Sequence, residues 1–235
     1  MNSSLKSRDF LSEQRYKLAF IDNDGTLVRC KSSWHVVHSS FGTLDEEKKL
    51  AERYFSQKIS YEEFIILSIR SWMSKLGKKI HVNDLLQPIF SKCPMRDDAV
   101  ELAEGLKTIG IKIVIVSAGI WLLSEKVGRE IGADMVLANK VKTDEKGYLT
   151  ETVSKLVDPR KKPEIIREVA DHFNVTLSQT IAIGDSLHDL NMLEMVGIGF
   201  LLENKDLFPI EKSKVATKSN VKIVRSLKDV LRHVS

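Results

Sequence analysis

Two carboxylates follow directly on a short apolar run near the start of the chain. The run Leu18–Ile21 has the length of a short buried strand, and Asp-Asn-Asp-Gly-Thr follows it at 22–26. A buried strand cannot hold two unpaired carboxylates, because a buried charge needs a partner or a metal. We therefore expect Asp22 and Asp24 where the strand leaves the sheet, which in open α/β folds is where ligands bind. Taken alone, the segment could also be a plain Asn-Asp-Gly turn.

Two later strands also end in polar residues. The apolar stretch 111–116 leads into Ser117, and the stretch 180–183 leads into Asp185 one residue later. Parallel strands bring their carboxyl ends to one edge of a sheet, so these side chains can converge with the first two carboxylates. Each has an ordinary alternative: Ser117 could cap a turn, Asp185 could cap the next helix, and Lys162 could be solvated charge. The joint pattern favours a site.

From Pro94 to the end of the chain, strands alternate with helices. We expect helices at 97–108, 121–131, 163–173, 188–195 and 227–234. We expect strands at 111–116, 135–138, 180–183, 197–201 and 215–217, with a hairpin over 141–153. This alternation predicts an α/β fold with a Rossmann-like, doubly wound parallel sheet as its core.

A helical block separates the first strand from this alternating region. Ser60 and Glu63 form a capping box, the helix after them ends at Gly77, and a short helix at 81–90 has Asn83 as its expected cap. No strand pattern interrupts the block, so we predict a small helical cap inserted after the first strand. The predicted domains are a core, 1–29 and 95–235, and a cap, 30–94.

Composition excludes several classes of protein. Hydrophobic residues make up 43% of the 235 and charged residues 29%, and the net charge is only +4. No apolar run approaches the roughly 20 residues that span a membrane, and no basic patch carries the aromatic residues of a nucleic-acid site. The start of the chain is polar, unlike a signal peptide. Cys30 and Cys93 match no metal or redox spacing, so we expect reduced thiols in a cytoplasmic protein.

Four motifs in this order resemble those of the haloacid dehalogenase superfamily, whose members are mostly phosphatases that react through an aspartate. They are Asp-x-Asp-Gly-Thr, a strand ending in serine, a lysine before a helix, and Gly-Asp-x-x-x-Asp after a strand. The resemblance covers nearly the whole chain and is closest to the phosphoserine phosphatase branch. Residues 179–185 and 189–193 look like the last motif of that branch. Residues 114–119 are similar to its second motif, where Gly-Gly is more usual than Ala-Gly.

The resemblance implies a role for each matching residue. Asp22 matches the nucleophile and Asp24 the general acid and base. The matching phosphate-binding positions are Thr26, Ser117, Ala118 and Gly119, with Lys162 as the catalytic lysine that balances charge. The matching metal ligands are Asp22, Asp185 and the backbone carbonyl of Asp24, supported by Ser186 and Asp189.

Phosphate chemistry requires such a set of groups. A phosphate monoester carries about two negative charges near neutral pH, so a carboxylate can attack it only if a cation offsets that charge. Mg²⁺ prefers oxygen ligands and is the expected cofactor. Asp24 must be protonated to help the leaving alkoxide depart, and it then activates water against the aspartyl-phosphate. The expected activity is Mg²⁺-dependent hydrolysis of a small-molecule phosphate ester by a monomer or homodimer.

The substrate is less well determined than the reaction. In the phosphoserine phosphatase branch a glutamate after the first motif holds the ammonium group of the substrate, but residues 28–35 contain no acid. Arg70 is the candidate for the cap arginine that binds the substrate carboxylate, and Trp34 or Trp72 could line the pocket. Because Arg29 and Lys31 flank the site, we expect a substrate that is anionic beyond its phosphate.

Two other functions use the same residues. A phosphotransferase or phosphomutase would pass the phosphoryl group from Asp22 to a second substrate instead of water. A catalytically silent, ligand-binding relative is the non-enzyme alternative. A dinucleotide-binding oxidoreductase would need Gly-x-Gly-x-x-Gly after the first strand, which is absent. The choice between phosphoserine, phosphoglycolate and other esters stays open, as do the oligomeric state and the role of Cys30.

Overall fold

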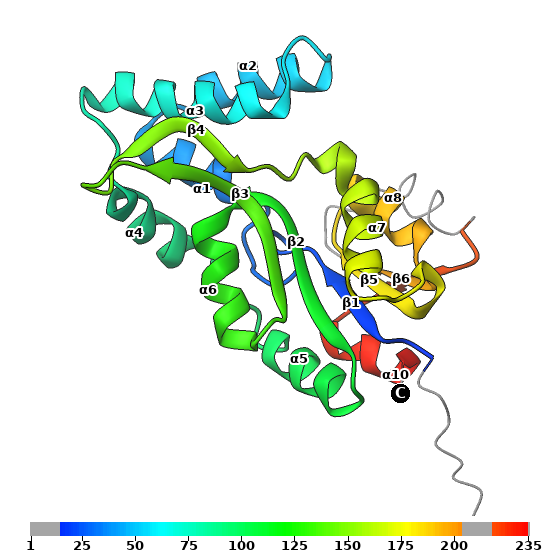
Figure 1. The fold of residues 1–235 in the computed structure, drawn as a ribbon. Coiled ribbons are helices and arrows are strands. Elements are labelled where there is room, and N and C mark those ends of the chain that lie inside the picture. The colour runs from blue at the N-terminus through cyan, green and yellow to red at the C-terminus, as the bar shows by residue number, and fades with distance from the viewer. Residues whose placement is uncertain (1–14, 204–217, 235) are drawn as a thin grey trace, which may run out of the picture.

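Within the residues that the structure describes, the sheet that carries the site residues has seven strands. A computed structural model describes residues 15–203 and 218–234 (Figure 1). The strands lie in the order β4-β3-β2-β1-β5-β6-β7. Their bounds are β1 Leu18–Ile21, β2 Lys112–Ile120, β3 Met135–Thr143, β4 Leu149–Lys155, β5 Thr180–Gly184, β6 Ile198–Leu202 and β7 Val221–Val224. Neighbouring strands are parallel except for the edge pair β3 and β4. The predicted α/β fold class is confirmed.

Alternate residues of the central strand β1 enter two different cores. Ala19 and Ile21 pack with α5 (Ala99–Thr108) and α6 (Trp121–Ile131) on one face of the sheet. Leu18 and Phe20 pack with α7 (Lys162–His172) and α8 (Leu190–Met195) on the other face. Side chains of a strand alternate between faces, so a strand with helices on both sides must be apolar throughout. The uninterrupted apolar character of β1 is therefore a consequence of its place in the middle of the sheet.

Four helices occupy the chain between β1 and β2. They are α1 Ser33–Phe41, α2 Leu44–Phe55, α3 Tyr61–Leu76 and α4 Val82–Lys92. Figure 1 shows α2 and α3 side by side at the end of the molecule where the β3–β4 hairpin rises. Ser60 and Glu63 form the expected capping box, and Gly77 ends α3 with a φ of 62°. The cap of α4 is His81 instead of Asn83, because the His81 ring accepts a hydrogen bond from the Asn83 backbone N–H. The division into core and cap at 30–94 stays a prediction.

Several elements differ from their expected bounds. β2 and β3 extend to Ile120 and Thr143, well past the expected ends of their strands. The helix expected at 188–195 starts with a 3-10 turn, η3 (Leu187–Asp189), and further 3-10 turns are η1 Pro159–Lys161, η2 Leu177–Gln179 and η4 Leu227–Val230. The last helix, α10, is Leu231–Val234. The strand expected at 215–217 lies outside the described residues, and β7 begins at Val221.

Length and hydropathy decide whether any of the described helices could span a membrane. Among residues 15–203 and 218–234, every helix is too short or too polar to cross a bilayer. The cytoplasmic location stays a prediction.

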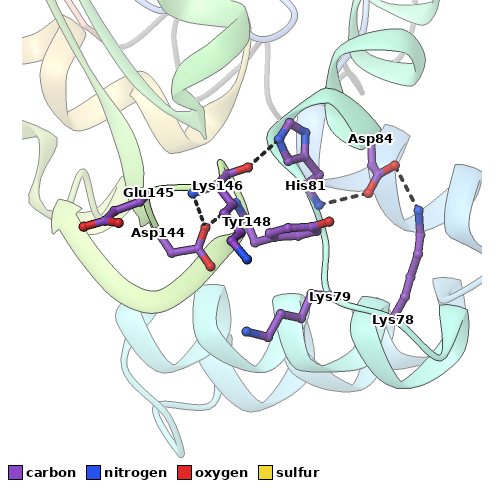
Figure 2. Close-up of a pocket in the computed structure, with 8 residues that line it drawn as sticks. All are labelled: Lys78, Lys79, His81, Asp84, Asp144, Glu145, Lys146 and Tyr148. Carbon is purple, nitrogen blue, oxygen red and sulfur yellow. Dashed lines mark hydrogen bonds and ion pairs between the residues drawn. The ribbon is translucent and has the colours of Figure 1, made fainter.

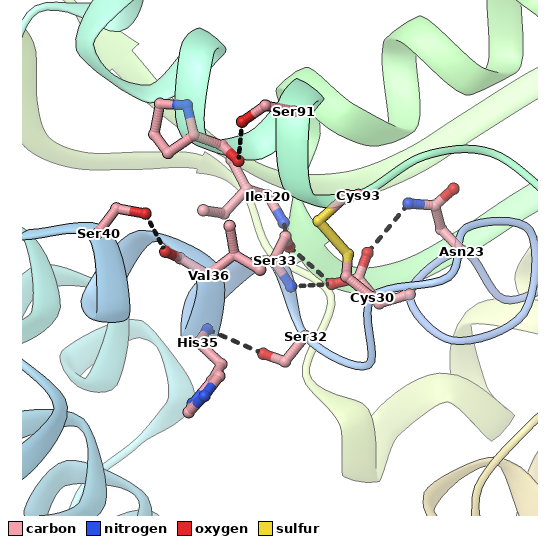
Figure 3. The surroundings of a disulfide bond; sticks show 12 residues. Asn23, Cys30, Ser32, Ser33, His35, Val36, Ser40, Ser91, Cys93 and Ile120 are labelled. Carbon is pink, nitrogen blue, oxygen red and sulfur yellow. Dashed lines mark hydrogen bonds between the residues drawn. A yellow bond between two sulfur atoms is a disulfide. The ribbon is translucent and has the colours of Figure 1, made fainter.

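The expectation of two reduced thiols is wrong, because Cys30 and Cys93 form a disulfide (Figure 3). Their Cα atoms lie 4.8 Å apart, within the range that a disulfide spans. The segments that enter and leave the four helices run antiparallel there: Val28 pairs with Met95, and the N–H of Arg29 donates to the carbonyl of Pro94. A separation of 63 residues in sequence gives no sign of this pairing, which only the fold creates.

Candidate active site

The first carboxylate stands where β1 leaves the sheet. The backbone N–H of Asp22 donates to the carbonyl of Ile183, which continues the pairing of β1 with β5 by one residue. The chain then turns tightly, and the carbonyl of Asn23 accepts hydrogen bonds from three successive amides, 26–28. Gly25 makes this turn with a φ of +82°, and a Cβ at that position would lie 2.2 Å from Asp185 Oδ2. Glycine is therefore required both for the turn and for the approach of Asp185.

A buried lysine joins two of the predicted carboxylates. Lys162 is the first residue of α7, and its Nζ lies 2.6 Å from Asp22 Oδ1 and 2.7 Å from Asp189 Oδ1. Only 4% of its side chain is exposed. Burial lowers the pKa of Lys162, but the two carboxylates more than offset this effect, so the pKa is raised and the ammonium stays charged. Asp189 is fixed from its other side by Ser186, whose Oγ donates to Oδ2 at 2.9 Å.

One ammonium does not balance the negative charge gathered here. Carboxylate oxygens of Asp22, Asp185 and Asp189 all lie within 4.8 Å of one another. Burial raises the pKa of Asp185 to about 7, and the Asp189 carboxylate adds to that shift. Burial likewise raises the pKa of Asp22, against the attraction of Lys162. A divalent cation among these oxygens would relieve the excess charge, so the cluster has the chemistry of a metal site.

Asp24 has different surroundings from Asp22. Its Oδ2 accepts hydrogen bonds from the backbone N–H and the hydroxyl of Ser33, at 2.6 and 2.7 Å. Its Oδ1 accepts one from Asn23 at 3.0 Å. Burial raises the pKa of Asp24, although these hydrogen bonds oppose the shift. Two carboxyl groups two residues apart, one in the acidic cluster and one bound to hydroxyl and amide donors, can hold different protonation states.

The end of β2 completes the wall of the site. Ser117 is fully buried, and its Oγ accepts a hydrogen bond from the backbone N–H of Gly119 at 3.0 Å. A Cβ on Gly119 would lie 2.5 Å from Asp24 Oδ2, so glycine makes room for that carboxylate. The carbonyl of Ala118 accepts three hydrogen bonds, from Trp34 Nε1, Tyr61 and Asn139. Thr26 donates to Asp185 at 3.4 Å.

These residues line one cavity of about 670 Å³. All the predicted site residues line the cavity except Thr26 and Arg70. Thr26 lies behind the lining and donates a hydrogen bond to Asp185, which does line the cavity. The cavity is also lined by residues of the helical block, among them Trp34, Tyr54, Tyr61 and Glu47. Of these, only Trp34 was expected in the pocket; the other three belong to no motif and reach the site through helix packing. Trp72 is buried within the block and does not line the cavity.

Two arginines that were expected near the substrate lie elsewhere. The guanidinium of Arg70 makes a two-point ion pair with Glu151 on β4, at 2.9 and 2.6 Å. Arg29 pairs with Asp97 at 2.7 Å. Neither residue lines the cavity. The prediction that Arg70 binds substrate is therefore not supported. The expectation of a second anionic group on the substrate was based on Arg29, Lys31 and Arg70, and of these only Lys31 lines the cavity.

A second cavity, of about 830 Å³, shares no residue with the first. It lies between the start of α4 and the turn of the β3–β4 hairpin (Figure 2). Nε2 of His81 donates a hydrogen bond to the carbonyl of Lys146, and Lys78 pairs with Asp84. Its lysines and carboxylates are mixed, and the contacts of His81 with Lys146 and Tyr148 tie the hairpin to the helical block. This cavity contains none of the catalytic residue set.

Comparison with known proteins agrees with the site. The family model described as haloacid dehalogenase-like hydrolase matches residues 19–194. A phosphoserine phosphatase of Archaeoglobus fulgidus is 27% identical over 206 residues, 87% of this chain, and the chain spans 58% of the length of that relative. A phosphoserine phosphatase of Methanocaldococcus jannaschii is 23% identical over 222 residues, 94% of this chain and 99% of its own length.

Among solved structures, a phospho-aspartyl intermediate analogue of phosphoserine phosphatase superposes with a TM-score of 0.71. It is 25% identical in sequence and covers 94% of this chain and 99% of its own. The sheet with its helices, the acidic cluster and these matches lead to one conclusion. The chain belongs to the haloacid dehalogenase-like hydrolase family, and within it the chain is similar to phosphoserine phosphatases.

Proposed function

We propose that this protein hydrolyses a small phosphate monoester by transferring the phosphoryl group to Asp22. One observation carries the proposal: the Asp22 carboxylate is held by a buried lysine beside two further carboxylates, at the end of the central strand. The family match and the phospho-aspartyl analogue of the similar structure support the same reaction.

Two carboxyl groups have different roles in the reaction: Asp22 is the nucleophile, and Asp24 is the general acid and base. Asp22 Oδ attacks phosphorus, and the bond from phosphorus to the leaving oxygen breaks. Asp24, whose pKa is raised by burial, gives its proton to that oxygen, so the leaving group departs as a neutral alcohol and Asp24 is left as a carboxylate. Asp24 then takes a proton from the water that attacks the aspartyl-phosphate, which returns Asp22 and phosphate.

The surrounding side chains hold the phosphoryl group. The oxygens of the phosphoryl group are proposed to be positioned by Ser117, Thr26 and the backbone at Ala118 and Gly119. The Lys162 ammonium offsets the negative charge that grows on these oxygens. Asp22 and Asp185, with the backbone carbonyl of Asp24, would hold Mg²⁺, and Ser186 with Asp189 would support them. Bound Mg²⁺ supplies the positive charge that lets an anionic nucleophile meet a phosphate dianion. The expected assembly stays a monomer or homodimer. The expected cytoplasmic location loses the support of reduced thiols, because Cys30 and Cys93 form a disulfide.

The variant Asp22→Asn tests the proposal. It should remove turnover of an aryl phosphate in the presence of Mg²⁺, whereas Asp171→Asn, an exposed change on α7, should leave turnover as it is. Free phosphate and any phosphorylated acceptor alcohol are measured together, because a phosphotransferase would deliver the group to the alcohol. Substantial turnover by Asp22→Asn would overturn the proposal.

A further inference from the structure

Five aromatic residues line the same cavity as the carboxylates, and we define them as its aromatic wall: Trp34, Tyr54, Phe55, Tyr61 and Phe64. Its rings come from α1, α2 and α3 and contact one another. Ring centroids lie 5.0 Å apart for Tyr54 and Tyr61, 5.4 Å for Tyr61 and Phe64, and 5.9 Å for Trp34 and Phe64. Since Asp22 and the aromatic wall line one cavity, a leaving group on a phosphate at Asp22 can reach the wall.

The polar groups of the aromatic wall already have acceptors within the protein. The hydroxyl of Tyr61 and the indole N–H of Trp34 both donate to the carbonyl of Ala118, at 2.7 and 3.0 Å. The hydroxyl of Tyr54 donates to Asp158 Oδ1 at 2.5 Å. The wall therefore offers the ligand ring surface, and it has no hydroxyl or indole donor to spare for an anionic group.

A carboxylate stands beside the aromatic wall. Glu47 of α2 lines the cavity, only 16% of its side chain is exposed, and its Oε2 lies 2.8 Å from Nδ1 of His35. Lys31 lines the cavity as well, but it belongs to the exposed residues, so its ammonium can be hydrated. Desolvated charges interact more strongly than hydrated ones, which favours Glu47 as the group that a ligand meets.

We propose that the leaving group is a short organic cation, so that the substrate is the phosphate ester of an amino alcohol, an inference that rests on the proposed function. Its ammonium group lies against the aromatic wall and next to Glu47. The negative face of an aromatic ring attracts a cation, and the nearby carboxylate adds a charge-assisted contact. The Tyr54 ring already holds a cation, the Arg160 guanidinium, 4.0 Å from its centroid, whereas among the described residues Trp34, Tyr61 and Phe64 stack only on other rings. We therefore assign the ligand to the rings of Trp34, Tyr61 and Phe64.

Charge and shape can be separated by one pair of substrates. Choline phosphate and 3,3-dimethylbutyl phosphate have the same shape, but only the first carries a positive charge. The protein with Mg²⁺ should hydrolyse choline phosphate or ethanolamine phosphate with a kcat/KM at least about tenfold above that of the neutral ester, the size expected for a desolvated cation on aromatic rings. Serine phosphate and glycolate phosphate complete the series.

The carboxylate is tested by Glu47→Gln, with Glu52→Gln as the matched control. Glu52 lies on the same helix, is exposed and does not line the cavity. Glu47→Gln should lower the ratio of kcat/KM for the cationic ester over the neutral ester at least fivefold, and Glu52→Gln should leave that ratio unchanged. A ratio that does not change in Glu47→Gln would overturn the assignment of Glu47.

Hydrolysis of an aryl phosphate needs no cation subsite, so this substrate distinguishes failure of the cation subsite from failure of the proposed phosphatase function. If the aryl phosphate is hydrolysed but the neutral or anionic esters equal or exceed the cationic ones, the inference is overturned and the proposed function stands. If no ester is hydrolysed, the aryl phosphate included, both are overturned. Competitive inhibition of aryl phosphate hydrolysis by free choline, and not by 3,3-dimethylbutanol, would support the same subsite independently.

Discussion

Replacing Lys162 by methionine removes an ammonium that contacts both Asp22 and Asp189. Methionine keeps most of the volume of the side chain, so the change is mainly one of charge. At an effective dielectric constant of ~20, each contact at 2.6 or 2.7 Å represents about 6 kcal/mol of Coulomb attraction. The cost of taking the ammonium out of water offsets several kcal/mol of this Coulomb attraction.

The expected result is a large loss of stability. Breaking a buried ion pair by removing one partner typically costs about 3–5 kcal/mol, because the remaining charges stay buried without a partner. For a chain of this size the midpoint of thermal unfolding should fall by about 6–20 °C. Urea unfolding at neutral pH in the presence of a chelator, followed by circular dichroism, measures the free energy of unfolding directly.

The exposed neighbour Lys161 supplies the control. Lys161→Met should change the free energy of unfolding by less than about 0.5 kcal/mol, as is usual for surface substitutions. If Lys162→Met lost no more than Lys161→Met, the lysine would not be balancing the buried carboxylates, and this reading of the cluster would be refuted.

Three further predictions follow from other parts of the structure. Asp24→Asn should slow esters of aliphatic alcohols about a hundredfold or more beyond its effect on aryl phosphates, whose phenolate leaves without a proton; equal losses in a steady-state phosphate assay would remove Asp24 from the acid role. Reduction of the Cys30–Cys93 disulfide, which closes a loop of 63 residues, should lower the free energy of unfolding by up to about 4 kcal/mol; urea curves with and without reductant measure this, and overlapping curves would contradict it. His38, buried against Trp72, has its pKa lowered from 6.5 to about 4 by burial, so the unfolded chain takes up the proton first. The contribution of neutral His38 to the free energy of unfolding is complete above pH 6.5 and is lost as the pH falls toward 4, by about 3 kcal/mol at most. His38→Gln should flatten the dependence of that free energy on pH between 6.5 and 4, and an unchanged slope would refute the assignment.

The parts of the fold that sequence predicts well are those specified by local pattern. The apolar run of β1 and the capping box at Ser60 both depend on neighbouring residues, and both are found where expected. The convergence of Asp22 and Asp185 was also predictable, since parallel strands place their ends at one edge of a sheet.

The parts that sequence could not predict depend on contacts between distant segments. The disulfide requires the antiparallel pairing of Val28 with Met95. Arg70 turns away from the cavity because Glu151, 81 residues further along, offers a two-point partner on β4. Glu47 reaches the cavity only through the packing of α2 beside α3, and no motif marks it.

The central claim is that the phosphoryl group passes through Asp22, and trapping that intermediate tests it most directly. Borohydride reduces an aspartyl-phosphate to homoserine, which mass spectrometry of the digested protein can locate. After quenching during turnover, the account predicts homoserine at position 22, dependent on substrate and Mg²⁺ and absent from Asp22→Asn. Reduction at another carboxylate, or no reduction at all during sustained turnover, would contradict it.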